Sequence, residues 1–167
     1  DIDLLGIFDT DEKSRGYSGA GKGLKEIFSK LMEAVISDLS SYTEEGYAYR
    51  VDMRLRPFGS SGELISSIRS LMDYYELSAS LWEIQAAIKM RPVAGNLRLG
   101  YDFMKQLETV INRPREHRRI IDSIDRMRKL AVQTYSRPLT DTVDIKSGIG
   151  GIRDVEFMVQ GLQLMHA

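Results

Sequence analysis

The sequence predicts an α+β fold, in which a strand–helix–strand core is followed by a helical bundle. Two segments, 1–9 and 47–57, have the apolar content or the two-residue alternation of short strands. Between them, segment 24–39 repeats its apolar residues at three- and four-residue steps, as an amphipathic helix does. Beyond residue 65 the pattern is mainly helical. We therefore expect a core domain over 1–65 and a helical extension over 66–167.

The first strand is rich in Ile, Leu and Phe and is followed by a glycine- and serine-rich segment, 13–23, which we expect to be a mobile loop. In the second strand, apolar residues alternate with charged ones up to Pro57. The intervening helix, extended to residue 41, should pack on the uncharged face of the two strands. Its predicted packing residues are Leu24, Ile27, Phe28, Leu31 and Val35.

The helical extension contains five segments with helical periodicity. They cover 65–76, 79–91, 97–112, 114–135 and 152–166. Pro114 suits a first helical turn, and the basic residues that follow it are expected to form a solvated helix face. A long connection over 137–151 carries three glycines near its end.

Composition excludes several kinds of chemistry. The chain of 167 residues has no cysteine, which rules out disulfides, zinc–cysteine sites and thiol catalysis. Its net charge of -1 gives no support for a nucleic-acid partner. We find no run of about 20 apolar residues that could span a bilayer, and no secretory signal pattern. We therefore expect a cytoplasmic protein without a membrane partner.

Three aspartates are candidate metal ligands and catalytic residues. Asp1 and Asp3 are two positions apart on a strand, so their side chains share a face, and Asp52 lies on the charged face of the second strand. Antiparallel neighbours would lie about 4.8 Å apart, which brings the three carboxylates together. A cation must then offset their mutual repulsion. Oxygen ligands suit Mg²⁺, and two such ions would serve a displacement at phosphorus.

The second strand also carries arginines on the face of Asp52, namely Arg50, Arg54 and Arg56. Guanidinium groups match phosphate oxygens in geometry and charge, so these residues are candidate phosphate or nucleotide ligands. A solvated edge strand with surface ion pairs would give the same alternation. The pattern by itself leaves both interpretations open.

Longer motifs carry a family resemblance. The chain reads DIDL at 1–4, YRVDMRLRPFG at 49–59, WE at 82–83, KMR at 89–91 and DIKSGIGGIRDVEF at 144–157. In this order and over nearly the whole chain, these motifs resemble the bacterial glutamine synthetase adenylyltransferase/adenylyl-removing enzymes. The resemblance implies a nucleotidyltransferase-type core, with Asp1, Asp3 and Asp52 at the positions of the family's metal carboxylates. The family's Gly and Ser before the first aspartate have no counterpart here, so we expect a core that is incomplete at its N-terminus.

The resemblance also implies a second part of the site. It suggests that segment 144–157 returns to the carboxylates and that four of its residues contact phosphate or nucleotide. These residues are Lys146, Gly150, Gly151 and Arg153.

The implied function is Mg²⁺-dependent nucleotidyl transfer that regulates glutamine synthetase. Arg153 favours the adenylyl-removing half, in which orthophosphate attacks AMP–tyrosine and releases ADP. The implied partners are glutamine synthetase, ATP or ADP, orthophosphate and a nitrogen-signalling regulatory protein. Two alternatives remain: the half that transfers AMP from ATP, and a truncated, non-catalytic module that binds nucleotide or a partner protein.

Overall fold

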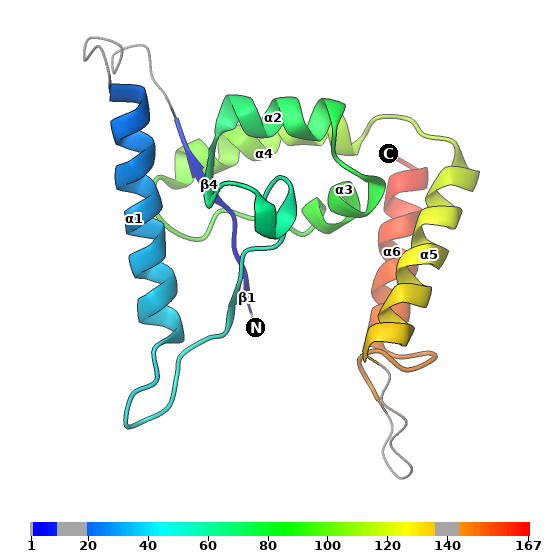
Figure 1. Cartoon of the computed structure of the whole chain (residues 1–167). Coiled ribbons are helices and arrows are strands. Elements are labelled where there is room, and N and C mark those ends of the chain that lie inside the picture. Colours follow the sequence, from blue (N-terminus) through cyan, green and yellow to red (C-terminus); the bar gives the residue numbers. More distant parts are fainter. Residues whose placement is uncertain (1, 10–19, 136–143) are drawn as a thin grey trace. The chain divides into compact units, whose positions relative to one another are not determined.

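The computed structural model describes residues 2–9, 20–135 and 144–167 (Figure 1). The chain forms two compact units. Unit 1 comprises Asp1–Ser78 and Pro92–Phe103, and unit 2 comprises Ala79–Arg91 and Met104–Ala167. Each unit combines separate stretches of the sequence. The predicted division of the chain into 1–65 and 66–167 is a different kind of boundary and stays a prediction.

Unit 1 is built on two pairs of short parallel strands. Strand β1 (Ile2–Asp3) pairs with β3 (Val51–Asp52), and β2 (Gly6–Phe8) pairs with β4 (Ile65–Ser67). The prediction that 1–9 and 47–57 are neighbours is confirmed. The antiparallel orientation assumed for them is wrong, because a long connection that contains a helix joins β2 to β3. Crossovers of this kind return the chain in the same direction.

The strands are shorter than predicted, for local reasons. β3 ends at Asp52 because the chain then turns: Arg56 N donates to Met53 O (3.2 Å) and Gly59 N to Arg56 O (2.9 Å). Phe58 adopts a left-handed conformation in this turn, with φ 62°. Segment 1–9 is divided into β1 and β2 rather than forming one strand. Strand β4 was missed, because a three-residue strand at the start of a helical pattern has no periodicity of its own.

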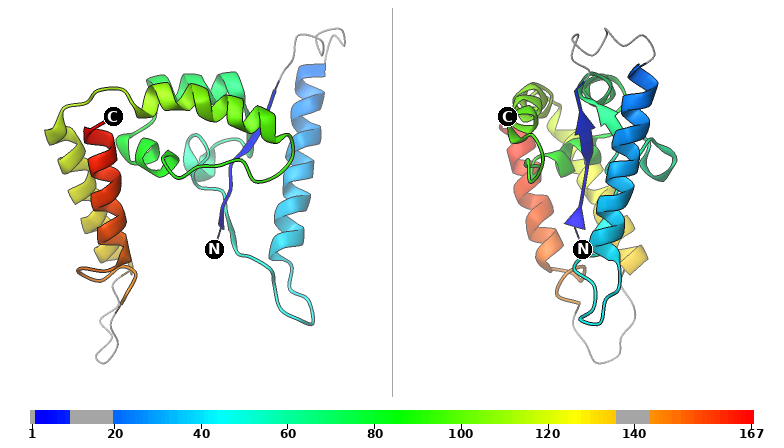
Figure 2. Two further views of the ribbon diagram at one scale, coloured as in Figure 1. Left: turned by 180° about the vertical axis from the view of Figure 1, so that it is seen from behind. Right: turned by 90° about the vertical axis from the view of Figure 1, so that its left-hand side faces the viewer.

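Helix α1 (Ala20–Ser40) begins earlier than expected, so residues 20–23 of the predicted loop are helical, while 10–19 lie outside the described residues. Both views show α1 beside the strands of unit 1 (Figures 1 and 2). Phe28 stacks on Phe8 of β2 with ring centroids 5.8 Å apart. Only part of the predicted stripe is used, however. Ile27 and Leu31 are 61% and 57% exposed, and Val35 is exposed as well.

The remaining core of unit 1 lies between the strands and α2 (Ile68–Leu77). The Ser67 hydroxyl caps this helix by accepting a hydrogen bond from Ser70 N (3.2 Å). The buried apolar residues of the unit are Phe8, Met53, Ile65, Leu71, Tyr75 and Phe103. Met53, the residue that follows Asp52, belongs to this core.

Unit 2 is helical and contains α3 (Leu81–Ala87), α5 (His117–Tyr135), α6 (Ile152–Met165) and the later residues of α4 (Leu97–Ile111). Helices α5 and α6 pack against each other and lie side by side in Figure 1. Gly161 allows this close packing, because a Cβ there would lie 2.4 Å from Ile124 Cδ1. The buried apolar side chains of the unit are Ile84, Ala87, Leu107, Val110, Ile120, Ala131 and Leu164.

The prediction that the chain is mainly helical after about residue 66 is confirmed, with helix bounds that shift by a few residues. The predicted helix over 79–91 shortens to α3, and Pro114 precedes α5 rather than lying in its first turn. Among the described helices, none is long and apolar enough to cross a bilayer.

Candidate functional site

The candidate site in unit 1 begins with two carboxylates. Asp3 and Asp52 are direct register partners on β1 and β3, held by hydrogen bonds from Ile2 N to Arg50 O and from Leu4 N to Asp52 O, each 2.9 Å long. Register partners in a parallel ladder project to the same face of the sheet, about 4.8 Å apart. Asp1 lies outside the described residues. The sequence-predicted juxtaposition is therefore present for Asp3 and Asp52.

Asp52 is already paired with the guanidinium group of Arg54. Its carboxylate accepts from the Arg54 backbone amide (2.8 Å) and from Arg54 Nε (2.8 and 3.0 Å). The Arg54 side-chain hydrogen bond holds the pKa of Asp52 below its usual value of 3.8, although burial acts in the opposite direction. Arg50 adds a smaller electrostatic contribution that also lowers this pKa. Asp52 is therefore ionised at neutral pH, and binding a metal would require part of its hydrogen bonding with Arg54 to be exchanged.

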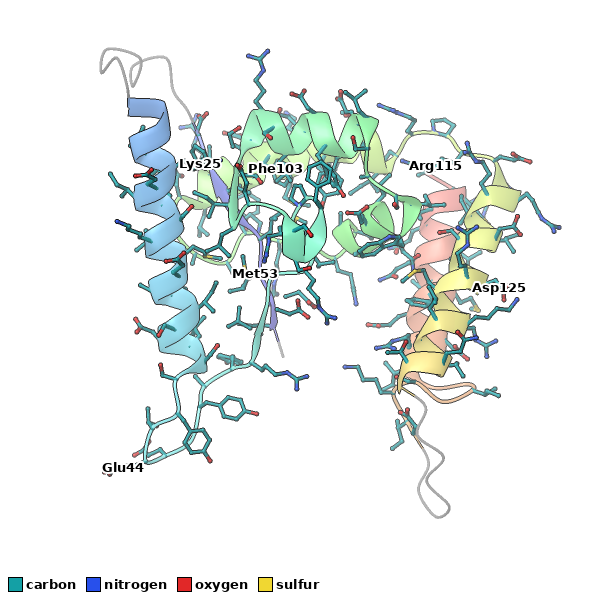
Figure 3. All side chains as sticks on the ribbon, in the orientation of Figure 1. Lys25, Glu44, Met53, Phe103, Arg115 and Asp125 are labelled. Carbon is teal, nitrogen blue, oxygen red and sulfur yellow. The ribbon has the colours of Figure 1, made fainter. Side chains whose placement is uncertain are left out.

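Arg56 does something that the sequence did not indicate. Its guanidinium donates to three backbone carbonyl oxygens, those of Gly62 (3.1 Å), Met53 (3.3 Å) and Ser60 (3.0 Å). These bonds close the turn that follows β3, so contact with a phosphate would require them to be exchanged. Figure 3 labels Met53 at the start of this turn. The phosphate role of Arg56 stays a prediction, and its observed role is to shape the turn.

The second candidate element, in unit 2, is the glycine loop, which we define as residues 144–153 and which includes the first two residues of α6. Asp144 Oδ1 accepts from Lys146 N (3.0 Å) and Ser147 N (2.8 Å), and Asp144 O accepts from Gly148 N (2.9 Å). Gly150 has φ 76°, a conformation that favours glycine. The loop is thus a compact turn that leads into α6.

The loop places its two predicted cationic residues at adjoining backbone positions. Ile152 N donates to Ile145 O (2.9 Å), and Arg153 N donates to Lys146 O (3.1 Å). Lys146 is exposed and Arg153 is half-buried. Both glycine amides are used inside the protein, because Gly151 N donates to Gly148 O and Gly150 N to the Asp154 carboxylate, each at 2.9 Å. The predicted site roles of Gly150 and Gly151 remain predictions, as does the approach of this loop to the carboxylates of unit 1.

Sequence reasoning overlooked Arg128. Placed among the solvated basic residues of α5, it instead forms a two-pronged ion pair with Asp154 of α6, with Nε–Oδ1 and Nη2–Oδ2 distances of 2.7 and 2.8 Å. This hydrogen bonding lowers the pKa of Asp154 from 3.8 to about 2. Nothing in the spacing of Arg128 distinguishes it from its basic neighbours, because its partner lies 26 residues away.

Other charged side chains are paired more simply. In unit 2, Lys89 forms a 2.8 Å ion pair with Glu156, and both side chains are exposed. In unit 1, Lys25 pairs with Glu63 (Lys25 is labelled in Figure 3). Within residues 2–9, 20–135 and 144–167, no three acidic or histidine side chains gather into a metal-ligating group. The third carboxylate of the predicted set, Asp1, is outside these ranges.

Together, these features define a class of protein. The chain has mixed α+β organisation, with short parallel strands followed by helices, and it aligns two aspartates beside arginine on adjacent strands. This arrangement is consistent with a fragment of a nucleotidyltransferase-like protein, in which carboxylates supply oxygen ligands and arginines supply positive charge.

Comparison with known proteins places the chain within that class. A family model described as glutamate-ammonia ligase adenylyltransferase matches residues 1–106, more than half of the chain. The chain therefore belongs to the glutamate-ammonia ligase adenylyltransferase family. A second family model, described as GlnD PII-uridylyltransferase, matches residues 118–167, the region of α5 and α6.

Individual relatives agree with this assignment. The chain is 40% identical over 172 residues to the bifunctional glutamine synthetase adenylyltransferase/adenylyl-removing enzyme of Pseudomonas aeruginosa. It is 37% identical over 166 residues to the protein of that name from Pseudomonas syringae pv. tomato, and 36% over 168 residues to that from Pasteurella multocida. These alignments cover 99–100% of this chain but only 17% of each relative. The chain thus spans about one sixth of the length of its curated relatives.

Proposed function

We propose that this chain forms part of a Mg²⁺-dependent enzyme that removes AMP from a modified tyrosine of glutamine synthetase by phosphorolysis. The observation that carries the proposal is the register pairing of Asp3 with Asp52 on adjacent parallel strands, beside Arg54. Membership of the adenylyltransferase family supports the substrate class. The names of the relatives include both adenylyl transfer and adenylyl removal, so the direction of the reaction is part of the proposal.

The donor set fits a hard divalent cation. Asp3 is exposed and Asp52 is half-buried, so both carboxylates are accessible, and both offer only oxygen. Asp52 has a lowered pKa and therefore needs no deprotonation at neutral pH. We propose that Asp3 and Asp52, together with Asp1, hold Mg²⁺. When bound there, the ion supplies charge neutralisation to the phosphate oxygens.

The reaction requires one displacement at phosphorus. An orthophosphate oxygen forms a bond to the phosphorus of AMP, the bond from this phosphorus to the tyrosine oxygen breaks, and the tyrosine oxygen takes the proton that orthophosphate releases. The products are ADP and unmodified tyrosine. The task of the protein is to hold two anions close together, which requires fixed positive charge.

Cationic side chains favour the removing direction. Orthophosphate is a free anion that must approach a phosphodiester already carrying negative charge, whereas an attacking tyrosine hydroxyl is neutral. In unit 1, Arg50 and Arg54 flank Asp52. We propose that these groups bind the phosphates, with guanidinium forks matching their oxygens.

A labelled-phosphate assay tests the proposal. The full-length enzyme carrying this sequence is supplied with AMP-modified glutamine synthetase, Mg²⁺ and labelled orthophosphate. The expected product is ADP labelled in its terminal phosphate. If no labelled ADP forms, and AMP from ATP is instead incorporated into unmodified glutamine synthetase, the transferring activity replaces the proposed one.

A further inference from the structure

Asp154 joins two segments of unit 2 at the start of α6. It accepts both prongs of the Arg128 guanidinium from α5, at 2.7 and 2.8 Å, and the backbone amide of Gly150, at 2.9 Å. An acid that merely complemented the helix dipole would need neither partner. We call this three-residue arrangement the Arg128–Asp154 clamp.

The clamp occupies the anion-binding capacity of the glycine loop itself. A glycine amide together with an arginine fork is a combination that suits an oxyanion, and here the Asp154 carboxylate takes that place. Gly150 has φ 76°, so its amide is directed by a backbone conformation that other residues adopt with strain. Substrate phosphate would therefore meet the side chains of this loop rather than the Gly150 amide.

The geometry of the loop determines which side chains those are. Arg153 N donates to Lys146 O at 3.1 Å, so the two cationic residues leave adjoining points of the backbone. Gly150 lies between them in the chain, and Asp154 follows directly after Arg153. The hydrogen bond from Arg153 N to Lys146 O sets the spacing of these residues, and the contact of Asp154 with Gly150 holds the segment between them.

We propose that Arg128 and Asp154 are positioning residues that hold the glycine loop so that Lys146 and Arg153 bind a substrate phosphate together. This inference rests on the proposed function for the identity of the phosphate. Arg128 acts through Asp154 and Gly150 and does not touch the substrate. Outer partners that orient metal ligands typically contribute 10–100-fold, and we expect an effect of the same order here.

The first measurement uses the chain itself, with inorganic phosphate as the probe. Orthophosphate is titrated while the backbone amide resonances of Lys146 and Arg153 are followed by NMR. Arg128→Gln should raise the dissociation constant by about 10-fold or more and should increase hydrogen exchange at the Gly150 amide. Arg128→Lys keeps the charge but loses the fork, so its dissociation constant for orthophosphate should lie between those of the wild type and Arg128→Gln.

Arg126→Gln is the matched control, because Arg126 is an exposed arginine on the same helix. It should change neither the phosphate affinity nor the Gly150 exchange. The inference is overturned if Arg128→Gln retains wild-type affinity for phosphate in a folded chain. It is also overturned if phosphate leaves the Lys146 and Arg153 resonances of the wild type unmoved.

The second measurement separates this inference from the proposed function. In the full-length enzyme, Arg128→Gln should raise the KM for orthophosphate about 10-fold or more while the Mg²⁺ concentration for half-maximal activity stays unchanged. A wild-type enzyme that produces no ADP overturns the proposed function, and the phosphate titration then decides the clamp by itself. An active wild type with an unaltered KM in Arg128→Gln overturns the clamp and leaves the function standing.

Discussion

Asp52 and Asp154 each form an ion pair with an arginine, but the two pairs differ in how far apart their members lie in the sequence. Asp52 is paired with Arg54, two residues along the same strand end, whereas Asp154 is paired with Arg128 from another helix. In both cases the hydrogen-bonded guanidinium lowers the pKa of the carboxyl group. The local pair holds a charged carboxylate in the candidate site, and the distant pair joins two elements.

Replacing Asp52 by asparagine tests its role as a metal ligand. Asp52→Asn should leave the protein folded and lower Mg²⁺-dependent turnover of the full-length enzyme by at least about 100-fold, because a neutral amide is a weaker ligand for a hard cation. Turnover is measured as ADP formation across a Mg²⁺ titration. Asp38→Asn, at an exposed position on α1, is the control and should retain activity. Near-normal turnover in folded Asp52→Asn would make Asp52 a structural residue.

The pKa of Asp154 predicts how its contribution to stability depends on pH. Its folded-state pKa, about 2, lies below the ordinary value of 3.8, so the ionised group stabilises the folded state. This contribution is complete above pH 3.8 and disappears as the pH falls toward 2. The wild type should therefore be more stable than Asp154→Asn at pH 5.5, and this difference should shrink at pH 2.5.

Urea unfolding of both proteins at the two pH values measures this effect. Asp122→Asn serves as the comparison, because Asp122 makes an exposed ion pair with Arg118 on its own helix. At pH 5.5, the free energy of unfolding of Asp122→Asn should differ less from that of the wild type than the free energy of unfolding of Asp154→Asn does. An Asp154→Asn difference that is equally large at pH 2.5 would show that shape rather than charge is responsible.

At the scale of elements, a polar contact fixes α3 against α6. The side chains of Gln85 and Gln160 are both buried and joined by a 2.8 Å hydrogen bond. Lys89, just past the end of α3, pairs with Glu156, which lies one turn before Gln160 on α6. An apolar interface tolerates sliding by a helical turn, whereas a buried amide pair has one satisfied register.

A double-mutant cycle tests this contact. Gln160→Leu should lower the free energy of unfolding by about 1–3 kcal/mol, because it leaves the buried amide of Gln85 without its partner. Adding Gln85→Leu should restore much of this loss, since both polar groups are then removed. Gln163→Leu, on the exposed side of α6, should change stability by no more than about 0.5 kcal/mol. Strictly additive losses in the double variant would contradict the proposed coupling.

Each unit of the whole molecule has its own apolar core, and these cores contain no metal-ligating group among the described residues. On the proposed function, removing Mg²⁺ with EDTA should abolish turnover of the full-length enzyme without unfolding this chain. The far-ultraviolet circular dichroism should be unchanged, and the melting temperature should move by less than about 4 °C, the shift that 1 kcal/mol gives in a chain of this size. Cooperative unfolding in EDTA would instead make the metal a structural component.

Much of the organisation follows from the sequence because it depends on local patterns. Helical periodicity correctly predicts the helical content after about residue 66, and the motifs correctly predict family membership. The closeness of Asp3 and Asp52 could also be predicted, since two strands with a helix between them commonly pair. The site roles proposed for Arg50, Lys146 and Arg153 remain predictions.

Other features were settled only by tertiary structure. Strand direction depended on the crossover through α1, and the end of β3 depended on Arg56 folding back to three carbonyl oxygens. The exposure of Ile27 and Leu31 depended on which face of α1 meets the strands. Arg128 looked like any other basic residue of its helix until α6 brought Asp154 to it. Periodicity shows which faces of an element are apolar, but partners distant in sequence decide which face is buried and which charge is paired.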